Sequence, residues 1–125
     1  MKTLVILFAF LLPVSLVTPD FSPVSKALSE GDAASLNNYM DNSIDITLFA
    51  KQTVVDKNTA TNLLRDFFGK NKPKSFSIDH QGTSKSANSH YTIGSLNASN
   101  GSFKVFVYYK GDGERPVIQE IRIEK

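Results

Sequence analysis

The sequence predicts an α+β domain in which helices pack against one face of an antiparallel sheet. Apolar residues recur at helical spacing early in the chain and again from Ala60 to Phe68. From Ser75 onward, apolar and polar residues alternate, as they do in half-buried strands. A chain in which helices come first and a run of strands follows has the element order of an α+β fold. The 125 residues leave room for a single hydrophobic core.

Residues 1–18 have the pattern of an export signal. Lys2 precedes an uninterrupted apolar run over residues 4–17, which is shorter than the ~20 apolar residues that a spanning helix needs. We expect cleavage between residues 15 and 22, which leaves 19–125 as one domain with no stable membrane span. The alternative is an uncleaved anchor. The expected location is the periplasm, the cell surface or the exterior of a Gram-negative bacterium.

The composition excludes several kinds of chemistry and of binding partner. The chain has no cysteine, which excludes disulfides, thiol catalysis, zinc–thiolate sites and a lipoprotein anchor. Small secreted eukaryotic domains are usually stabilised by disulfides, so the absence of disulfides in an exported chain of this size favours a bacterial protein. Removing Lys2 lowers the formal net charge from +2 to about +1. Near-neutral charge argues against nucleic-acid binding, and we interpret Lys70, Lys72 and Lys74 as a solvated helix end.

The domain is expected to open with a broken helix. Ser22 is the predicted N-cap and Pro23 the first helical residue. Gly31 then ends this segment, and Asp32 caps a second short one. A longer helix follows, because one apolar stripe repeats at i, i+3, i+4, i+7 and i+8. Its members are Ala60, Leu63, Leu64, Phe67 and Phe68.

Period-two alternation predicts strands over residues 43–50, 75–82, 90–96 and 116–125. The segment 103–110 is apolar on both faces, which indicates a central strand or one that meets a partner.

Turn residues separate the later strands. Asn100-Gly101 is a tight-hairpin signal, because both central residues of such a turn need positive φ. Gly111-Asp112-Gly113 is expected to turn the chain back into its last strand.

Three sequence blocks carry a resemblance to known proteins. The blocks NLLRDFFGKNKPKSFSIDHQG, YTIGSL and VIQEIRIEK resemble a small exported bacterial family, domain-of-unknown-function family 4783. The order of elements resembles the nuclear transport factor 2-like superfamily, which has a cystatin-like fold. The resemblance covers essentially the whole mature chain and implies a cone-shaped domain, with a bent sheet around helices and a cavity between them.

The resemblance does not choose a function. The superfamily includes a steroid isomerase, dehydratases, cyclases, transport adaptors and noncatalytic domains that bind ligands or dimerise, so fold alone is not decisive. The smaller family implies no catalytic residues. Superfamily members often dimerise through the outer sheet face, so Phe106 and Tyr108, which lack an obvious partner inside one domain, are candidate interface residues of a homodimer.

Four polar residues are candidates for the lining of a ligand cavity. Alternation places His80 on the same face as Phe76 and Ile78. The same reasoning places three more polar side chains among inward apolar neighbours, and the candidate set is His80, Tyr91, Tyr109 and Gln119. Convergent polar groups in an apolar pocket can bind a small apolar ligand, or they can be hydrogen-bonded core residues.

Catalysis is disfavoured because the expected acid–base pair is missing. Alternation points Asp45 and Asp79 outward, whereas an isomerase of this superfamily needs a carboxylate inside the cone. His80 and His90 have no carboxylate on the same face, so we expect no metal, and no motif indicates a cofactor. We predict an exported noncatalytic domain that binds a small ligand, associates with itself, or both. The alternatives are a small isomerase- or dehydratase-type enzyme using His80 and a tyrosine, and a structural envelope protein without a pocket.

Overall fold

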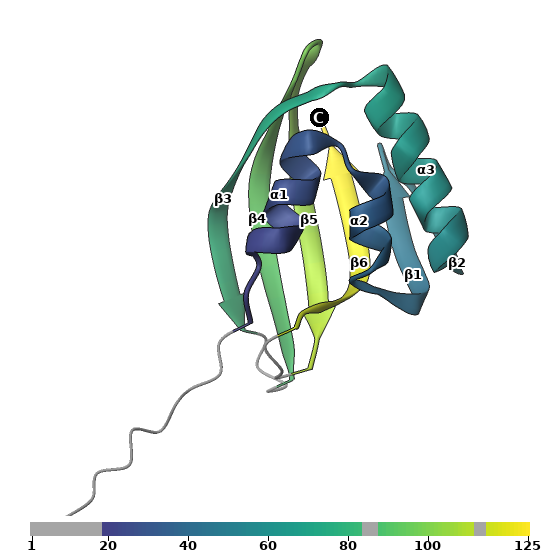
Figure 1. Cartoon of the computed structure of the whole chain (residues 1–125), viewed down its shortest axis with the longest axis vertical. Helices are drawn as coiled ribbons and strands as arrows, with labels where there is room; N and C mark the ends of the chain where they lie inside the picture. Colours follow the sequence, from purple (N-terminus) through teal and green to yellow (C-terminus); the bar gives the residue numbers. More distant parts are fainter. Residues whose placement is uncertain (1–18, 84–87, 112–114) are drawn as a thin grey trace, which may run out of the picture.

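The computed structural model describes residues 19–83, 88–111 and 115–125. These residues form three helices and six strands (Figure 1). In chain order the elements are α1 (Ser22–Glu30), α2 (Ala33–Asn37), β1 (Met40–Leu48), β2 (Lys51–Asp56), α3 (Lys57–Lys70), β3 (Pro73–Thr83), β4 (Ser89–Ala98), β5 (Gly101–Lys110) and β6 (Val117–Glu124). The predicted signal segment, residues 1–18, lies outside the described residues.

The six strands form one sheet in the order β2-β1-β6-β5-β4-β3. Neighbouring strands are antiparallel except β1 and β6, which are parallel. The sheet is therefore mixed, whereas the sequence predicted an antiparallel one. The two parallel strands are joined by a long connection through α3 and four strands, and only a long connection allows neighbours to run in the same direction. The segment 103–110 lies in β5, inside the sheet, as predicted.

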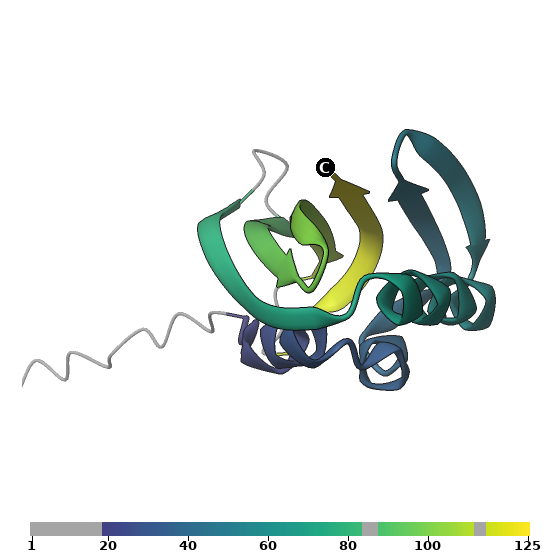
Figure 2. The same cartoon turned by 90° about the horizontal axis from the view of Figure 1, so that it is seen from above.

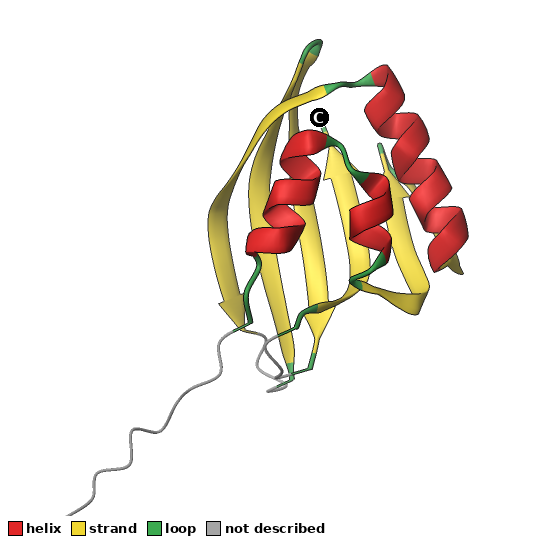
Figure 3. Cartoon of the chain, in the orientation of Figure 1, coloured by secondary structure: helices red, strands yellow, loops and turns green. Residues whose placement is uncertain are grey.

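All three helices cover the same face of the sheet, and we call this face the helix-facing side (Figures 2 and 3). The core lies between these two layers and is fully enclosed at positions such as Leu28, Leu64 and Ile121. Burial of this apolar surface is the main force that holds the layers together. The opposite side of the sheet, the outer face, carries no helix in the described structure. None of the helices described is long and apolar enough to cross a bilayer.

Side chains at the helix ends satisfy free backbone groups. The Asp32 carboxylate accepts from the Ser35 N–H at 3.0 Å, and the Asp56 carboxylate accepts from the Thr59 N–H at 2.8 Å. Gly31 ends α1 with φ of 65°, a left-handed conformation that glycine adopts without steric cost. The predicted N-cap Ser22 is instead the first residue of α1.

The two-residue turns differ from the predicted ones. The β4–β5 loop consists of Ser99 and Asn100, because Ala98 pairs with Gly101. A tight hairpin therefore joins β4 and β5 at the predicted place, but Gly101 begins β5 and Asn100 does not have positive φ, so the predicted central pair Asn100-Gly101 is wrong. Positive φ at both central residues occurs instead at Phe49 (51°) and Ala50 (70°), between β1 and β2. Most of the predicted turn at 111–113 lies outside the described residues.

Candidate functional site

The outer face is organised as two rows of side chains that cross all six strands in register. The first row is His80, Ile93, Phe106, Arg122, Thr47 and Gln52. The second row is Gly82, Tyr91, Tyr108, Glu120, Asp45 and Val54. In both rows the larger apolar side chains stand on β4 and β5, and the charged ones on β6 and β1. The face therefore has an aromatic half and a charged half.

The aromatic half remains accessible to solvent. Tyr108 is 40% exposed, and Phe106 and Ile93 are half-buried. The rings of Tyr91 and Tyr108 lie 6.2 Å apart in a tilted pair. Tyr91 also lies over Gly82, because a Cβ built on that glycine would be 2.6 Å from the tyrosine oxygen. A cluster of apolar side chains on an uncovered sheet face is typical of an interaction surface.

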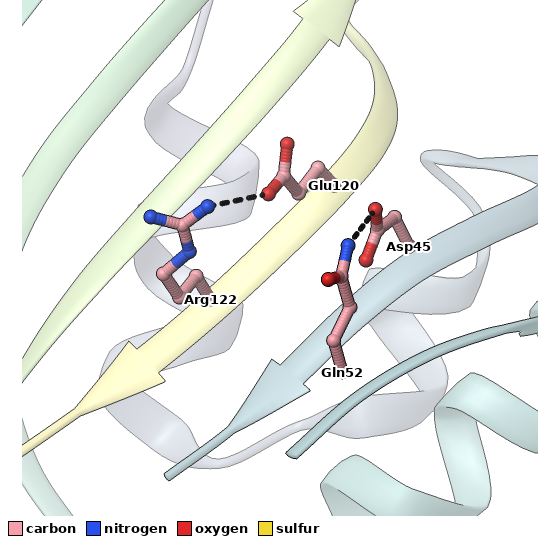
Figure 4. Close-up of polar contacts among 4 residues, drawn as sticks. All are labelled: Asp45, Gln52, Glu120 and Arg122. Carbon is pink, nitrogen blue, oxygen red and sulfur yellow. Dashed lines mark hydrogen bonds and ion pairs between the residues drawn. The ribbon is translucent and has the colours of Figure 1, made fainter. Parts of the chain in front are cut away.

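The charged half contains two polar pairs on neighbouring strands (Figure 4). Arg122 Nη2 donates to Glu120 Oε1 at 3.1 Å, and its guanidinium lies 5.8 Å from the centre of the Phe106 ring. Gln52 Nε2 donates to Asp45 Oδ2 at 2.7 Å. Asp45 Oδ1 is buried and has no hydrogen-bond partner among the residues that the structure describes. An ionised carboxylate accepts several hydrogen bonds, so Asp45 retains unused acceptor capacity.

A shallow groove of about 510 Å³ runs beside these pairs. Its lining includes Asp41, Asp45, Glu120, Tyr108 and Gln119. Lys110 Nζ lies 2.8 Å from the Asp41 carboxylate, and this hydrogen bond holds the pKa of Asp41 below its usual value.

Two bulges decide where His80 and Gln119, two of the four predicted cavity residues, lie. In β3, Ile78 pairs with Gly94 and His80 with Ile93, so Asp79 is an extra residue that reverses the alternation. His80 is therefore exposed on the outer face, although the sequence placed it beside Phe76 and Ile78 on the inner side.

A second bulge separates two of the other predicted residues. Tyr108 pairs with Glu120 and Tyr109 with Ile118, which leaves Gln119 unpaired and exposed. Gln119 therefore lines the outer groove with Tyr108, rather than a cavity beneath the helices. Tyr91 stands on the outer face, in the second row, although the sequence placed it inside. No bulge interrupts the pairing of β4 with β5, and the alternation was assigned to the wrong face, because Thr92 and Leu96 are the buried side chains of this strand.

Tyr109 is the one predicted cavity residue that points to the helix-facing side. It is 1% exposed, its hydroxyl lies 3.4 Å from the Thr92 hydroxyl, and the Phe21 ring packs 4.7 Å from its own. Burial raises the pKa of Tyr109 far above its ordinary value, and the Thr92 hydrogen bond opposes this only in part. The sheet separates His80 from Tyr109, so the structure does not bring this histidine and this tyrosine together. Among the described residues, no group of three or more histidine or acidic side chains is placed to hold a metal ion.

The described architecture is the nuclear transport factor 2-like fold. A solved structure described as an NTF-2 like protein of unknown function from Silicibacter pomeroyi superposes with a TM-score of 0.55 and 11% identity, over 82% of this chain and 86% of that one. A de novo designed protein with a curved β-sheet superposes with a TM-score of 0.66 at 10% identity, over 82% and 93%. At these identities the likeness concerns the fold alone.

The chain belongs to the family described as domain of unknown function DUF4783, whose sequence profile matches residues 21–124. A family member from Bacteroides ovatus is 34% identical with a TM-score of 0.77, over 83% of this chain and 93% of that one. A member from Bacteroides uniformis is 35% identical with a TM-score of 0.75, over 82% and 94%. None of the curated proteins compared with the chain matches it.

Proposed function

We propose that this protein is an exported, noncatalytic domain that associates with a second copy of itself through the outer face. The observation that carries this proposal is the pair of register-aligned rows on a face that no described helix covers. Apolar side chains in these rows, including Tyr108 and Val54, which is 66% exposed, gain stability if a partner removes them from water.

The two halves of the face are complementary to one another. A two-fold axis parallel to the strands and lying between β5 and β6 sets the aromatic half of one copy against the charged half of the other. Phe106 then lies opposite Arg122 of the second copy, where a guanidinium can stack on a ring. Tyr108 lies opposite Glu120 of the second copy, and a tyrosine hydroxyl can donate to a carboxylate. Each contact occurs twice, as it must in an isologous dimer.

Groups that form such contacts are available in the isolated chain. Within the described residues, the hydroxyls of Tyr91 and Tyr108 have no hydrogen-bond partner, and Asp45 Oδ1 has no donor. A second copy therefore supplies donors on one half of the face and acceptors on the other.

The size of the face suits a stable dimer. Six strands spaced by ~4.8 Å give a width of roughly 24–29 Å, and about eight residues at ~3.3 Å each give a length near 26 Å. The projected area is about 600–750 Å², and side chains increase the accessible area beyond this. A standard protein interface buries about 800 Å² per partner, so contact over the whole face is sufficient.

Export is supported by the amino-terminal sequence, with its single lysine before an apolar run and the complete absence of cysteine. Intact-mass analysis of the protein recovered from the envelope fraction tests this part. We expect a chain that begins between residues 15 and 22. An unprocessed chain confined to the cytosol would contradict export.

Sedimentation equilibrium of the chain from Pro19 onward, which contains every described element, tests self-association. We expect a dimer that Tyr108→Glu weakens by at least about 30-fold, because the new carboxylate faces Glu120 of the second copy. Asn62→Glu is the matched control, since it adds the same charge at an exposed position of α3. A wild-type monomer at millimolar concentration, or equal effects of the two substitutions, would contradict the proposal.

A further inference from the structure

A second groove lies on the helix-facing side, between α3 and the hairpin formed by β1 and β2. It has a volume of about 300 Å³. Its walls are aliphatic, and its rim carries one lysine and two hydroxyl groups. The lining consists of Ile46, Leu48, Val55 and Leu63, with Lys51, Thr53 and Thr59 at the more polar positions.

The groove carries one positive charge, the Lys51 ammonium, that is not neutralised by a lining acidic side chain. Lys51 makes no ion pair with any residue in the described ranges. The Thr53 hydroxyl is likewise without a partner there, whereas the Thr59 hydroxyl donates to the Asp56 carboxylate at 3.2 Å. The groove thus offers an aliphatic slot with a free ammonium and a free hydroxyl, which complements an apolar chain ending in an anion.

The hairpin that forms one wall is held in a costly conformation. Phe49 and Ala50 both have positive φ, although such turns favour asparagine and glycine. The Phe49 ring packs 5.8 Å from Phe67 on α3 and 5.8 Å from Phe103 on β5, and its N–H donates to the Ile123 carbonyl at 3.0 Å. These contacts fix the hairpin relative to α3, and backbone strain of this kind is found at ligand-binding clamps. The backbone strain of this turn is a second observation, separate from the chemistry of the lining residues, and it also indicates a ligand site at this groove.

We infer that this groove binds a free aliphatic carboxylate of about eight carbons. A volume near 300 Å³ holds roughly ten non-hydrogen atoms at ~30 Å³ each, and octanoate has that many. The alkyl chain lies along Ile46, Leu48 and Leu63, and the carboxylate meets Lys51. The site faces away from the outer face, so it does not depend on self-association.

The test uses sodium octanoate as the probe and the chain from Pro19 onward, followed by amide chemical shifts in NMR titrations. We expect saturable shifts along β2 and the first half of α3, with a dissociation constant on the order of 0.1–1 mM for so small a ligand. Octanol and octylammonium should bind at least about five-fold more weakly, because neither offers an anion to Lys51.

Three variants make the test specific. Lys51→Gln should weaken octanoate at least about five-fold without changing octanol binding. Lys74→Gln, which removes the same charge from an exposed position of β3, should change neither. Thr53→Phe should abolish octanoate binding by filling the slot, and its circular dichroism should remain that of the folded domain because aromatic residues favour strands. Absence of saturable shifts at the groove, or equal binding of all three probes, would overturn the inference.

Discussion

Substitution of Gly94 by alanine should destabilise the domain, because β3 lies too close for a side chain at this point of β4. A Cβ at Gly94 would be 2.3 Å from Phe76 Cζ and 2.6 Å from the carbonyl oxygen of Ser77. Carbon atoms normally pack at about 3.5–4.0 Å, so the ring must withdraw by at least about 1.2 Å. The carbonyl belongs to the backbone of β3, which cannot yield without disturbing its pairing with β4.

The expected cost follows from these two displacements. Overpacking a core position costs about 1–3 kcal/mol, and a weakened ladder hydrogen bond adds about 0.5–1.5 kcal/mol. We therefore expect Gly94→Ala to lower the free energy of unfolding by about 3 kcal/mol. For a domain of this size, that corresponds to a fall in Tm of roughly 12–24 °C. Urea unfolding followed by circular dichroism measures the free energy, and calorimetry measures Tm.

Two other glycines provide matched controls. Gly69 in α3 has no atom within 4 Å of its virtual Cβ, so Gly69→Ala should stabilise the domain by about 0.5 kcal/mol. The three atoms nearest to a Cβ at Gly82 all belong to the Tyr91 side chain, which can swing away on the outer face, so the cost of Gly82→Ala should stay below about 1 kcal/mol. If Gly94→Ala were as stable as wild type, or no worse than Gly82→Ala, the described packing of β3 on β4 would be refuted.

Three further outcomes are expected. Ala50→Gly should raise the free energy of unfolding in urea by about 0.5–1 kcal/mol, because glycine adopts positive φ without the cost that alanine bears; a loss of stability would contradict the turn geometry. Asp32→Ala should lower Tm at pH 7, because the Ser35 hydroxyl and N–H hold the pKa of Asp32 below 3.8. This contribution exists above the unfolded-state pKa and is lost as pH falls through the lowered folded-state pKa, so the two Tm curves should converge below that folded-state pKa; a constant difference would argue against the cap. Phe21→Ala should cost about 1–2 kcal/mol in urea unfolding, because it removes the ring that packs on Tyr109; an unchanged midpoint would mean that Phe21 does not belong to the core.

Sequence periodicity was sufficient to predict the helices and strands that bury a continuous apolar stripe or face. The helix from Ala60 to Phe68 and the strand at 103–110 appear where alternation and helical spacing place them. The parallel pairing of β1 with β6 could not be read from either strand, since side-chain alternation is the same for parallel and antiparallel neighbours.

The candidate site was predicted less well, and the bulges explain the misplacement of His80 and Gln119. A single extra residue reverses which face every later side chain occupies, and no local sequence signal marks Asp79 or Gln119 as that residue. The outward direction of Phe106 and Tyr108 was predicted correctly, because neither lies beyond a bulge in its own strand. Gln52, the hydrogen-bond donor to Asp45, could not be predicted because only the strand pairing brings these residues together.

Isotope-filtered NMR of a sample that mixes labelled and unlabelled protein tests self-association through the outer face most directly. The proposed two-fold arrangement predicts intermolecular NOEs between the Phe106 ring and the Arg122 side chain of the second copy, and between Tyr108 and Glu120. Intermolecular NOEs confined to the helices, or none at concentrations where sedimentation shows a dimer, would contradict it.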